Sequence, residues 1–268
     1  MSRIDGAIAA ARAAGRIAFI PYLTAGDPSE DQTSRLVPTL ERCGADIVEI
    51  GVPFSDPLAD GEVNQRAARR ALSRGVSLSS VLDLVTRLRR STEVPLVLFT
   101  YFNPILRMGL SRFASRAAAA GVDGVLVTDL PPEESEEYRR ELVGAGVDTI
   151  FLLAPTSPPD RVRRVGDASR GFIYYVSRTG VTGEQESLPP DVRERVREIR
   201  SLTGRPVAVG FGISRREHLV DLASFADGAV VGSALVRLVE EHGDKPDLPD
   251  ALARRLRDLL PWPSPSEA

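Results

Sequence analysis

The chain has almost none of the chemistry that cysteine, lysine and histidine provide. Cys43 is the only cysteine among 268 residues, which excludes an internal disulfide and a thiolate metal site. Lys245 is the only lysine, so neither a P-loop nor a Schiff-base lysine at a strand end is available. His218 and His242 stand apart, without a second ligand at metal spacing. We therefore expect neither a metal nor a cofactor.

Strong charge and long apolar runs are also missing. The net charge is −3 and the basic residues are scattered, so no surface for nucleic acid is indicated. The first residues form no apolar leader, and no run reaches the length that spans a bilayer. We expect a cytoplasmic protein that binds neither nucleic acid nor membrane.

Apolar runs rich in β-branched residues alternate with segments of helical period along the whole chain. This alternation is typical of α/β proteins with a parallel sheet, and eight such units favour a single (β/α)8 TIM barrel. A doubly wound sheet fits the same periodicity. The predicted strands are residues 17–23, 46–50, 96–101, 124–127, 149–153, 172–176, 207–209 and 229–231.

Extra helices are expected at the N-terminus (6–14), in the second loop (64–72, before the helix 79–89) and at the C-terminus (249–259). We predict one domain over residues 1–260 and a frayed Pro/Ser-rich tail over 261–268. A Gly-x-Asp sequence ending at Asp46, Asp123 and Asp148 precedes three of the strands and forms a weak internal repeat.

Glu49 is a carboxylate inside an otherwise apolar strand, directly before a loop broken by glycine and proline that ends at Asp60 and Gly61. Burial raises the pKa of such a group toward neutrality, where it can both donate and accept a proton. Asp60 can accept a hydrogen bond from a bound substrate. The alternative for Glu49 is a strand-end residue satisfied by backbone amides.

The functional face of a TIM barrel is the C-terminal end of its strands. The sixth strand ends in Tyr174 and Tyr175, and strand alternation allows only one of them to point inward and orient Glu49. Both tyrosines could instead serve packing alone.

Glycines after the last three strands predict a phosphate site built from backbone amides, with a helix starting at Ser233 directed at the anion. The polar segment 177–187, which contains Arg178 and Thr182, is interpreted as a lid over that site, an ordinary surface loop being the alternative. The three glycine-rich turns are Gly180-Val181-Thr182-Gly183, Gly210-Phe211-Gly212-Ile213-Ser214 and Gly232-Ser233.

Four sequence motifs together resemble the tryptophan synthase alpha subunit over nearly the whole chain. They are Phe19-Ile20-Pro21-Tyr22-Leu23-Thr24-Ala25-Gly26-Asp27-Pro28, the stretch from Glu49 to Gly61, Tyr174-Tyr175-Val176-Ser177 with Gly180-Val181-Thr182-Gly183, and Gly210-Phe211-Gly212-Ile213. The resemblance implies retro-aldol cleavage of indole-3-glycerol phosphate to indole and glyceraldehyde 3-phosphate, without metal or lysine.

The same resemblance implies residue roles. Glu49 would transfer protons, Asp60 would accept the indole N–H, and Tyr174 would position the glutamate. The phosphate would be held by Gly183, Gly212, Gly232 and Ser233. The indole pocket would be lined by Tyr22, Asn64, Phe99, Leu126 and Thr128. A pyridoxal-phosphate beta subunit would contact Pro53, Asp56, Pro57 and Asn103 in an alpha2beta2 heterotetramer.

Asn64 and Thr128 depart from the family pattern, because an apolar residue is expected at position 64 and Pro or Ala at 128. They leave open a stand-alone lyase that releases free or substituted indole without a beta partner. A phosphoribosyl-sugar isomerase would need carboxylates at the ends of the first and fifth strands, where Leu23-Thr24-Ala25 and Leu153-Ala154-Pro155 have none. A catalytically idle subunit would lack Glu49 or Asp60.

Overall fold

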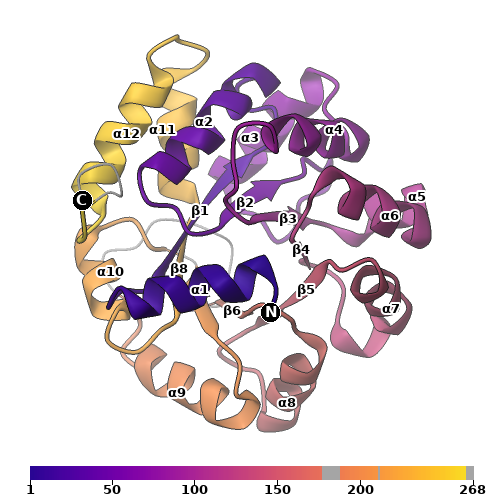
Figure 1. Ribbon diagram of the computed structural model, residues 1–268, viewed down its shortest axis with the longest axis vertical. Helices are drawn as coiled ribbons and strands as arrows, with labels where there is room; N and C mark the ends of the chain where they lie inside the picture. Colours follow the sequence, from indigo (N-terminus) through magenta and orange to yellow (C-terminus); the bar gives the residue numbers. More distant parts are fainter. Residues whose placement is uncertain (177–187, 211, 264–268) are drawn as a thin grey trace.

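Eight parallel strands close into a barrel in sequence order (Figure 1), as predicted. The computed structural model describes residues 1–176, 188–210 and 212–263. Every predicted strand is present, with each end shifted by at most two residues. The strands are β1 (Ala18–Thr24), β2 (Val48–Gly51), β3 (Leu96–Thr100), β4 (Gly124–Val127), β5 (Asp148–Leu153), β6 (Ile173–Val176), β7 (Val207–Gly210) and β8 (Gly228–Val231).

Helices surround the barrel and carry the decorations that the sequence predicts at both ends and in the second loop. They are α1 (Arg3–Ala13), α2 (Glu30–Arg42), α3 (Glu62–Ser73), α4 (Leu78–Leu88), α5 (Phe102–Met108), α6 (Leu110–Ala120), the 3-10 turn η1 (Pro132–Glu134), α7 (Glu136–Gly144), α8 (Pro159–Ala168), α9 (Val192–Thr203), α10 (Arg216–Leu222), α11 (Ser233–His242) and α12 (Leu248–Leu259).

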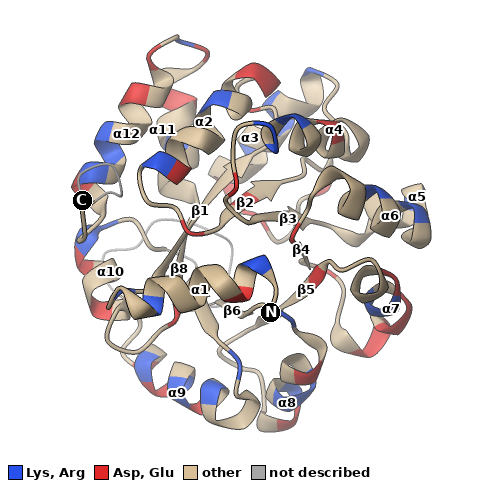
Figure 2. Cartoon of the chain, in the orientation of Figure 1, with Lys and Arg blue, Asp and Glu red and all other residues tan. Residues whose placement is uncertain are grey.

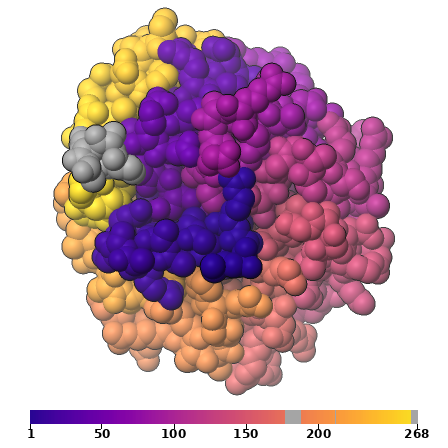
Figure 3. Space-filling model, viewed as in Figure 1, coloured from indigo at the N-terminus to yellow at the C-terminus, as the bar shows by residue number. Residues whose placement is uncertain are grey.

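Helix α1 closes the N-terminal end of the barrel, where it crosses the middle of the face seen in Figures 1 and 3. It starts earlier than predicted because Ser2 and Asp5 form a capping box. Ile4 and Ile8 are buried in the cluster that fills the lumen. A Cβ at Gly124, the first residue of β4, would lie 2.8 Å from Ile4 Cδ1. The C-terminal end of the strands is therefore the end left for a site.

Asp46 and Asp123 fasten the starts of neighbouring strands, which gives the predicted repeat a structural purpose. Asp46 accepts a 2.8 Å hydrogen bond from the N–H of Phe19, the second residue of β1, and Asp123 accepts a 2.7 Å hydrogen bond from the N–H of Leu96, the first residue of β3. Asp148 differs, since its Oδ2 is buried without a hydrogen-bond partner in the described part of the chain. The repeat itself is present at all three positions, since Gly44, Gly121 and Gly146 each have the positive φ of a helix-ending glycine. Among the described residues, the carboxylates of Asp46 and Asp123 are the ones that accept this hydrogen bond from a neighbouring strand.

Acidic and basic side chains alternate over the outer helices rather than separating onto different sides (Figure 2). The helices that the structure describes are all too short or too polar to cross a membrane.

Candidate active site

Glu49 lies on β2 with its side chain directed into the barrel. Its register partners are Tyr22 on β1 and Val97 on β3, both members of the lumen cluster. The residue is 1% exposed, and neither carboxylate oxygen has a hydrogen-bond partner among the described residues. Burial away from water raises the pKa of Glu49 to about 8. No backbone amide within the described residues donates a hydrogen bond to this carboxyl. The alternative of a strand-end residue satisfied by backbone amides therefore does not apply to Glu49.

Asp60 lies in the loop between β2 and α3 and is also buried. Its Oδ2 accepts a hydrogen bond of 3.0 Å from the hydroxyl of Tyr101. Desolvation raises the pKa of Asp60 to about 6, and hydrogen bonds from Tyr101 and Asn64 limit the rise. Its Oδ1 is buried and has no hydrogen-bond partner in the described ranges.

Glu49 and Asp60 thus differ in protonation at neutral pH. With pKa values of about 8 and about 6, Glu49 is mostly protonated and Asp60 mostly ionised. Both carboxyls raise the pKa of Tyr22 and of Tyr174, after desolvation as the main cause, which places the four side chains in one neighbourhood. Two carboxyl groups whose surroundings separate their pKa values are typical of an acid and an electrostatic partner at a catalytic site.

Tyr174 and Tyr175 point to opposite sides of β6. Tyr174 belongs to the lumen cluster, whereas Tyr175 packs in the outer cluster between strands and helices. Strand alternation therefore selects Tyr174, the tyrosine that the resemblance implied. Its ring lies against Gly210, where a Cβ would come within 2.2 Å of the tyrosine oxygen. The charge of Glu49 raises the pKa of Tyr174, but the tyrosine hydroxyl makes no hydrogen bond to the Glu49 carboxylate.

The predicted indole pocket is assembled at this end of the lumen. Tyr22, Phe99 and Leu126 are buried together, and the rings of Tyr22 and Phe99 meet edge to face with centroids 5.4 Å apart. Asn64 is buried beside Asp60. Thr128 is half-buried, and its hydroxyl donates at 3.3 Å to the backbone carbonyl of Thr100 while lowering the pKa of the neighbouring Tyr101, so it lies on the polar side of the pocket.

The predicted phosphate residues lie across the rim from Glu49, beyond β1. Gly232 precedes α11, and none of the described side chains caps this helix, so its first backbone amides and the positive end of its dipole are available to an anion as far as the structure describes the chain. A Cβ at Gly232 would lie 3.6 Å from Tyr22 Cβ. Gly212 has φ +85°, a backbone conformation that favours glycine. Gly183, Arg178 and Thr182 lie outside the described residues.

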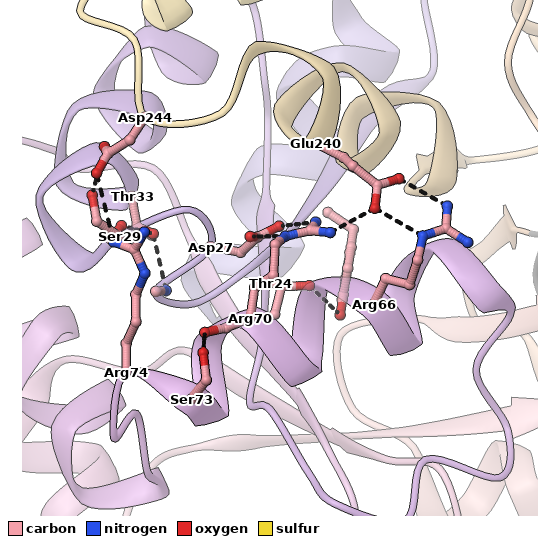
Figure 4. Close-up of polar contacts among 12 residues, drawn as sticks. Thr24, Asp27, Ser29, Thr33, Arg66, Arg70, Ser73, Arg74, Glu240 and Asp244 are labelled. Carbon is pink, nitrogen blue, oxygen red and sulfur yellow. Dashed lines mark hydrogen bonds and ion pairs between the residues drawn. The ribbon is translucent and has the colours of Figure 1, made fainter.

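An ion-pair network joins the walls of the site (Figure 4). Arg70 of α3 binds both oxygens of buried Asp27 at 2.7 and 2.8 Å and Glu240 of α11 at 2.6 Å. Arg66 binds both oxygens of Glu240 at 2.8 Å. The helix that follows Asp60 is thereby fastened to the helix that follows Gly232.

The residues expected to meet a beta subunit lie on one side of this rim. Pro53 and Asn103 line the same groove, of about 470 Å³, together with Phe54. Asp56 is exposed and Pro57 half-buried in the loop that leads to Asp60, outside the groove lining. The structure therefore brings Pro53 and Asn103 together, and the other two residues lie farther along the loop that contains Pro53.

Tyr101 is the site residue to which the sequence assigned no role. It donates to Asp60, accepts a 3.0 Å hydrogen bond from the Ala59 N–H, and stacks on Phe54 with centroids 5.0 Å apart. The sequence feature that could have identified Tyr101 is its position directly after β3, at the functional end of the barrel. Its contact with Asp60, however, depends on the pairing of β2 with β3 and cannot be read from local sequence.

Comparison with known proteins gives one consistent match. The model of the family described as "Tryptophan synthase alpha chain" matches residues 8–256. A tryptophan synthase alpha chain from Solibacter usitatus is 50% identical over 259 residues, which cover 97% of each chain. The solved alpha subunit from Legionella pneumophila has a TM-score of 0.88 at 35% identity and 97% coverage of each chain. The Pyrococcus furiosus tryptophan synthase a2b2 complex contains a chain with a TM-score of 0.81 at 39% identity, covering 91% of this chain and 97% of that one.

Proposed function

The chain belongs to the tryptophan synthase alpha chain family, and we propose that Glu49 and Asp60 carry out the reaction of that family in it. It is a carbon–carbon lyase that cleaves indole-3-glycerol phosphate to indole and glyceraldehyde 3-phosphate. The observation that carries the residue assignment is the buried Glu49 carboxyl, whose oxygens lack hydrogen-bond partners among the described residues and whose pKa is about 8.

Glu49 acts twice in one turnover. Being protonated at neutral pH, it first donates a proton to C3 of the indole ring. The resulting carboxylate then accepts the proton of the C3′ hydroxyl while the C3–C3′ bond breaks and its electron pair returns to the ring. One proton enters and one leaves, so the glutamate ends in its starting state and the aldehyde departs.

Asp60 stabilises the charge that forms between these steps. Protonation of C3 places positive charge on the ring nitrogen, whose N–H the ionised Asp60 accepts through its free Oδ1. Because the ring itself holds the electrons of the breaking bond, the reaction needs no cofactor. Tyr174, Tyr22, Phe99 and Leu126 exclude water around it.

The substrate phosphate binds at the start of α11 and in the turn after β7. Gly232 and Ser233 present backbone amides at the positive end of the helix dipole, and Gly212 keeps the facing turn free of a side chain. Gly183 would complete this site from outside the described residues. With a single lysine in the chain, at position 245, these backbone groups provide the recognition.

A beta subunit binds the side of the rim that contains the groove. Pro53, Phe54 and Asn103 line it, and exposed apolar residues flank it: Leu58 is 89% exposed and Leu106 is 57% exposed. The a2b2 assembly of the Pyrococcus furiosus relative favours this subunit role over a stand-alone lyase. A cytoplasmic location agrees with the use of only one cysteine.

The test is to follow aldehyde release from indole-3-glycerol phosphate by the purified chain, with and without a tryptophan synthase beta subunit. We expect slow release alone and faster release in the complex. Equal rates in both would identify a stand-alone lyase, and no release in either would overturn the function. The variant Glu49→Gln, which keeps the side-chain shape, is the matched inactive control.

A further inference from the structure

Asn64 provides a buried acceptor beside Asp60 that the proposed reaction does not use. The residue is 6% exposed and lies in the first turn of α3, four positions after Asp60, and its side chain lowers the pKa of the Asp60 carboxyl. Because a carboxylate only accepts hydrogen bonds, the amide nitrogen is the atom that faces Asp60. The amide oxygen Oδ1 then remains, buried and without a hydrogen-bond partner among the described residues.

Asp60 Oδ1 is a second buried acceptor in the same state, since Tyr101 occupies only Oδ2. The ring N–H of the substrate supplies one donor for these two acceptors. A buried acceptor that stays unpaired is unfavourable, and a site containing one favours the ligand that brings the missing donor. The site can therefore accept one more hydrogen bond than the single N–H of an unsubstituted indole ring supplies.

The described surroundings on α3 do not supply that donor. Val63 and Ala67, the neighbours of Asn64 on this helix that reach the lumen cluster, are both apolar. Neither oxygen of Glu49 has a hydrogen-bond partner among the described residues, so the protonated carboxyl does not donate to Asn64, and Tyr101 already directs its hydroxyl hydrogen to Asp60. A ligand group is thus the natural partner for the Asn64 oxygen.

We infer that Asn64 and Asp60 form a two-acceptor edge that selects indoles with a second hydrogen-bond donor beside the ring N–H. This inference rests on the proposed function, in which Asp60 accepts that N–H. On the side of the nitrogen away from the glycerol chain, the adjacent substitutable ring carbon is C7. The added substrate class is indole glycerol phosphate with a hydroxyl or amino group at C7.

The reverse reaction tests this directly, because it condenses a free indole with glyceraldehyde 3-phosphate. The compounds are indole, 7-hydroxyindole and 7-methylindole, the last matching the hydroxyl in size without donating. We expect kcat/KM for 7-hydroxyindole to exceed that for 7-methylindole by about tenfold, an ordinary effect of one paired hydrogen bond. In Asn64→Leu, which keeps the shape and removes the amide, the ratio should fall about tenfold.

Gln65→Leu is the matched control, since Gln65 donates at 2.8 Å to the backbone carbonyl of Asp60 and not to its carboxyl. Its hydroxy-to-methyl ratio should equal that of the unmodified protein. Calorimetric binding of the two indoles to the unmodified chain and to Asn64→Ala gives the same comparison without turnover, should the leucine variant not fold. An identical ratio with and without the amide overturns the inference. Failure of plain indole to react would instead overturn the proposed function, and the binding ratio would still decide the role of Asn64.

Discussion

The hydroxyl of Tyr101 donates a 3.0 Å hydrogen bond to Asp60, linking the end of β3 to the loop after the neighbouring strand β2. The same oxygen accepts the N–H of Ala59, the residue before Asp60. Tyr101 is only 4% exposed and stacks on Phe54 of the same loop. The position and the ionisation of Asp60 therefore both depend on this tyrosine.

Tyr101→Phe should move the acidic limb of the pH–rate profile upward. Rate is lost as pH falls through the pKa of Asp60, about 6, because Asp60 must be ionised to accept the ring N–H. The Tyr101 hydrogen bond lowers that pKa against desolvation, so its removal raises the pKa. The upper limb, where Glu49 loses its proton near pH 8, should stay in place. The measurement is kcat/KM from pH 5 to 9.

Tyr175→Phe is the control for this profile, because Tyr175 packs in the outer cluster away from both carboxyls. It should leave the two limbs where they are in the unmodified protein. An acidic limb that does not move in Tyr101→Phe would mean that the tyrosine does not control the ionisation of Asp60.

Glu49→Gln should lower kcat by roughly a thousandfold, the usual contribution of a general acid and base, while stabilising the fold at alkaline pH. The pKa of Glu49 is raised from 4.5 to about 8, so unfolding releases its proton between those values and stability falls as pH rises through that window. A glutamine at this position cannot ionise, so the variant lacks the loss of unfolding free energy caused by the raised pKa. That loss amounts to roughly 4 kcal/mol at pH 8 and about 1 kcal/mol at pH 5. Urea unfolding of both proteins at the two pH values measures the difference. A stability gain that does not grow with pH would show that Glu49 is already ionised in the folded protein.

Much of this arrangement could be predicted from local sequence, because strands and their faces follow from periodicity. The alternation in β6 made one of Tyr174 and Tyr175 an inward residue, and the structure places Tyr174 there. The glycine after β8 marked the start of α11 in the same way. Glu49 stood out because a charged residue is rare in an apolar strand.

Contacts between distant segments could not be predicted. Tyr101 meets Asp60 across 41 positions, and Arg70 meets Glu240 across 170. Both pairs depend on the order in which strands close the barrel and on side-chain directions that no local pattern specifies. The departure at Asn64 was visible in the sequence, but its contact with Asp60 and its unpaired oxygen required the structure.

Alanine at Gly210 should lower the stability of the fold, whereas alanine at Gly232 should weaken substrate binding and leave stability unchanged. At Gly210 the new Cβ would lie 2.2 Å from the Tyr174 oxygen, so the ring must move, with a stability loss of about 1–3 kcal/mol. At Gly232 the nearest atom is Tyr22 Cβ at 3.6 Å, an ordinary contact, so stability should be unchanged. The methyl group there would occupy the phosphate site and raise KM. Urea unfolding and steady-state kinetics separate the two; an unchanged KM in Gly232→Ala would place the phosphate elsewhere.

Arg70→Met should destabilise the protein by about 2 kcal/mol at neutral pH, because it leaves the carboxylate of Asp27 buried without its cation. This value is below that for a fully buried pair, since the Arg70 side chain is 32% exposed. Desolvation raises the pKa of Asp27, and the nearby Arg70 lowers it. The stability loss in Arg70→Met should therefore shrink as pH falls toward 3.8, where the aspartate becomes protonated in the unfolded protein as well. Arg66→Met is the control: Glu240 keeps Arg70 as its partner, and the expected loss is under about 1 kcal/mol. Equal losses in the two variants, or a loss in Arg70→Met that is independent of pH, would show that the buried Asp27 charge does not determine the stability of this network.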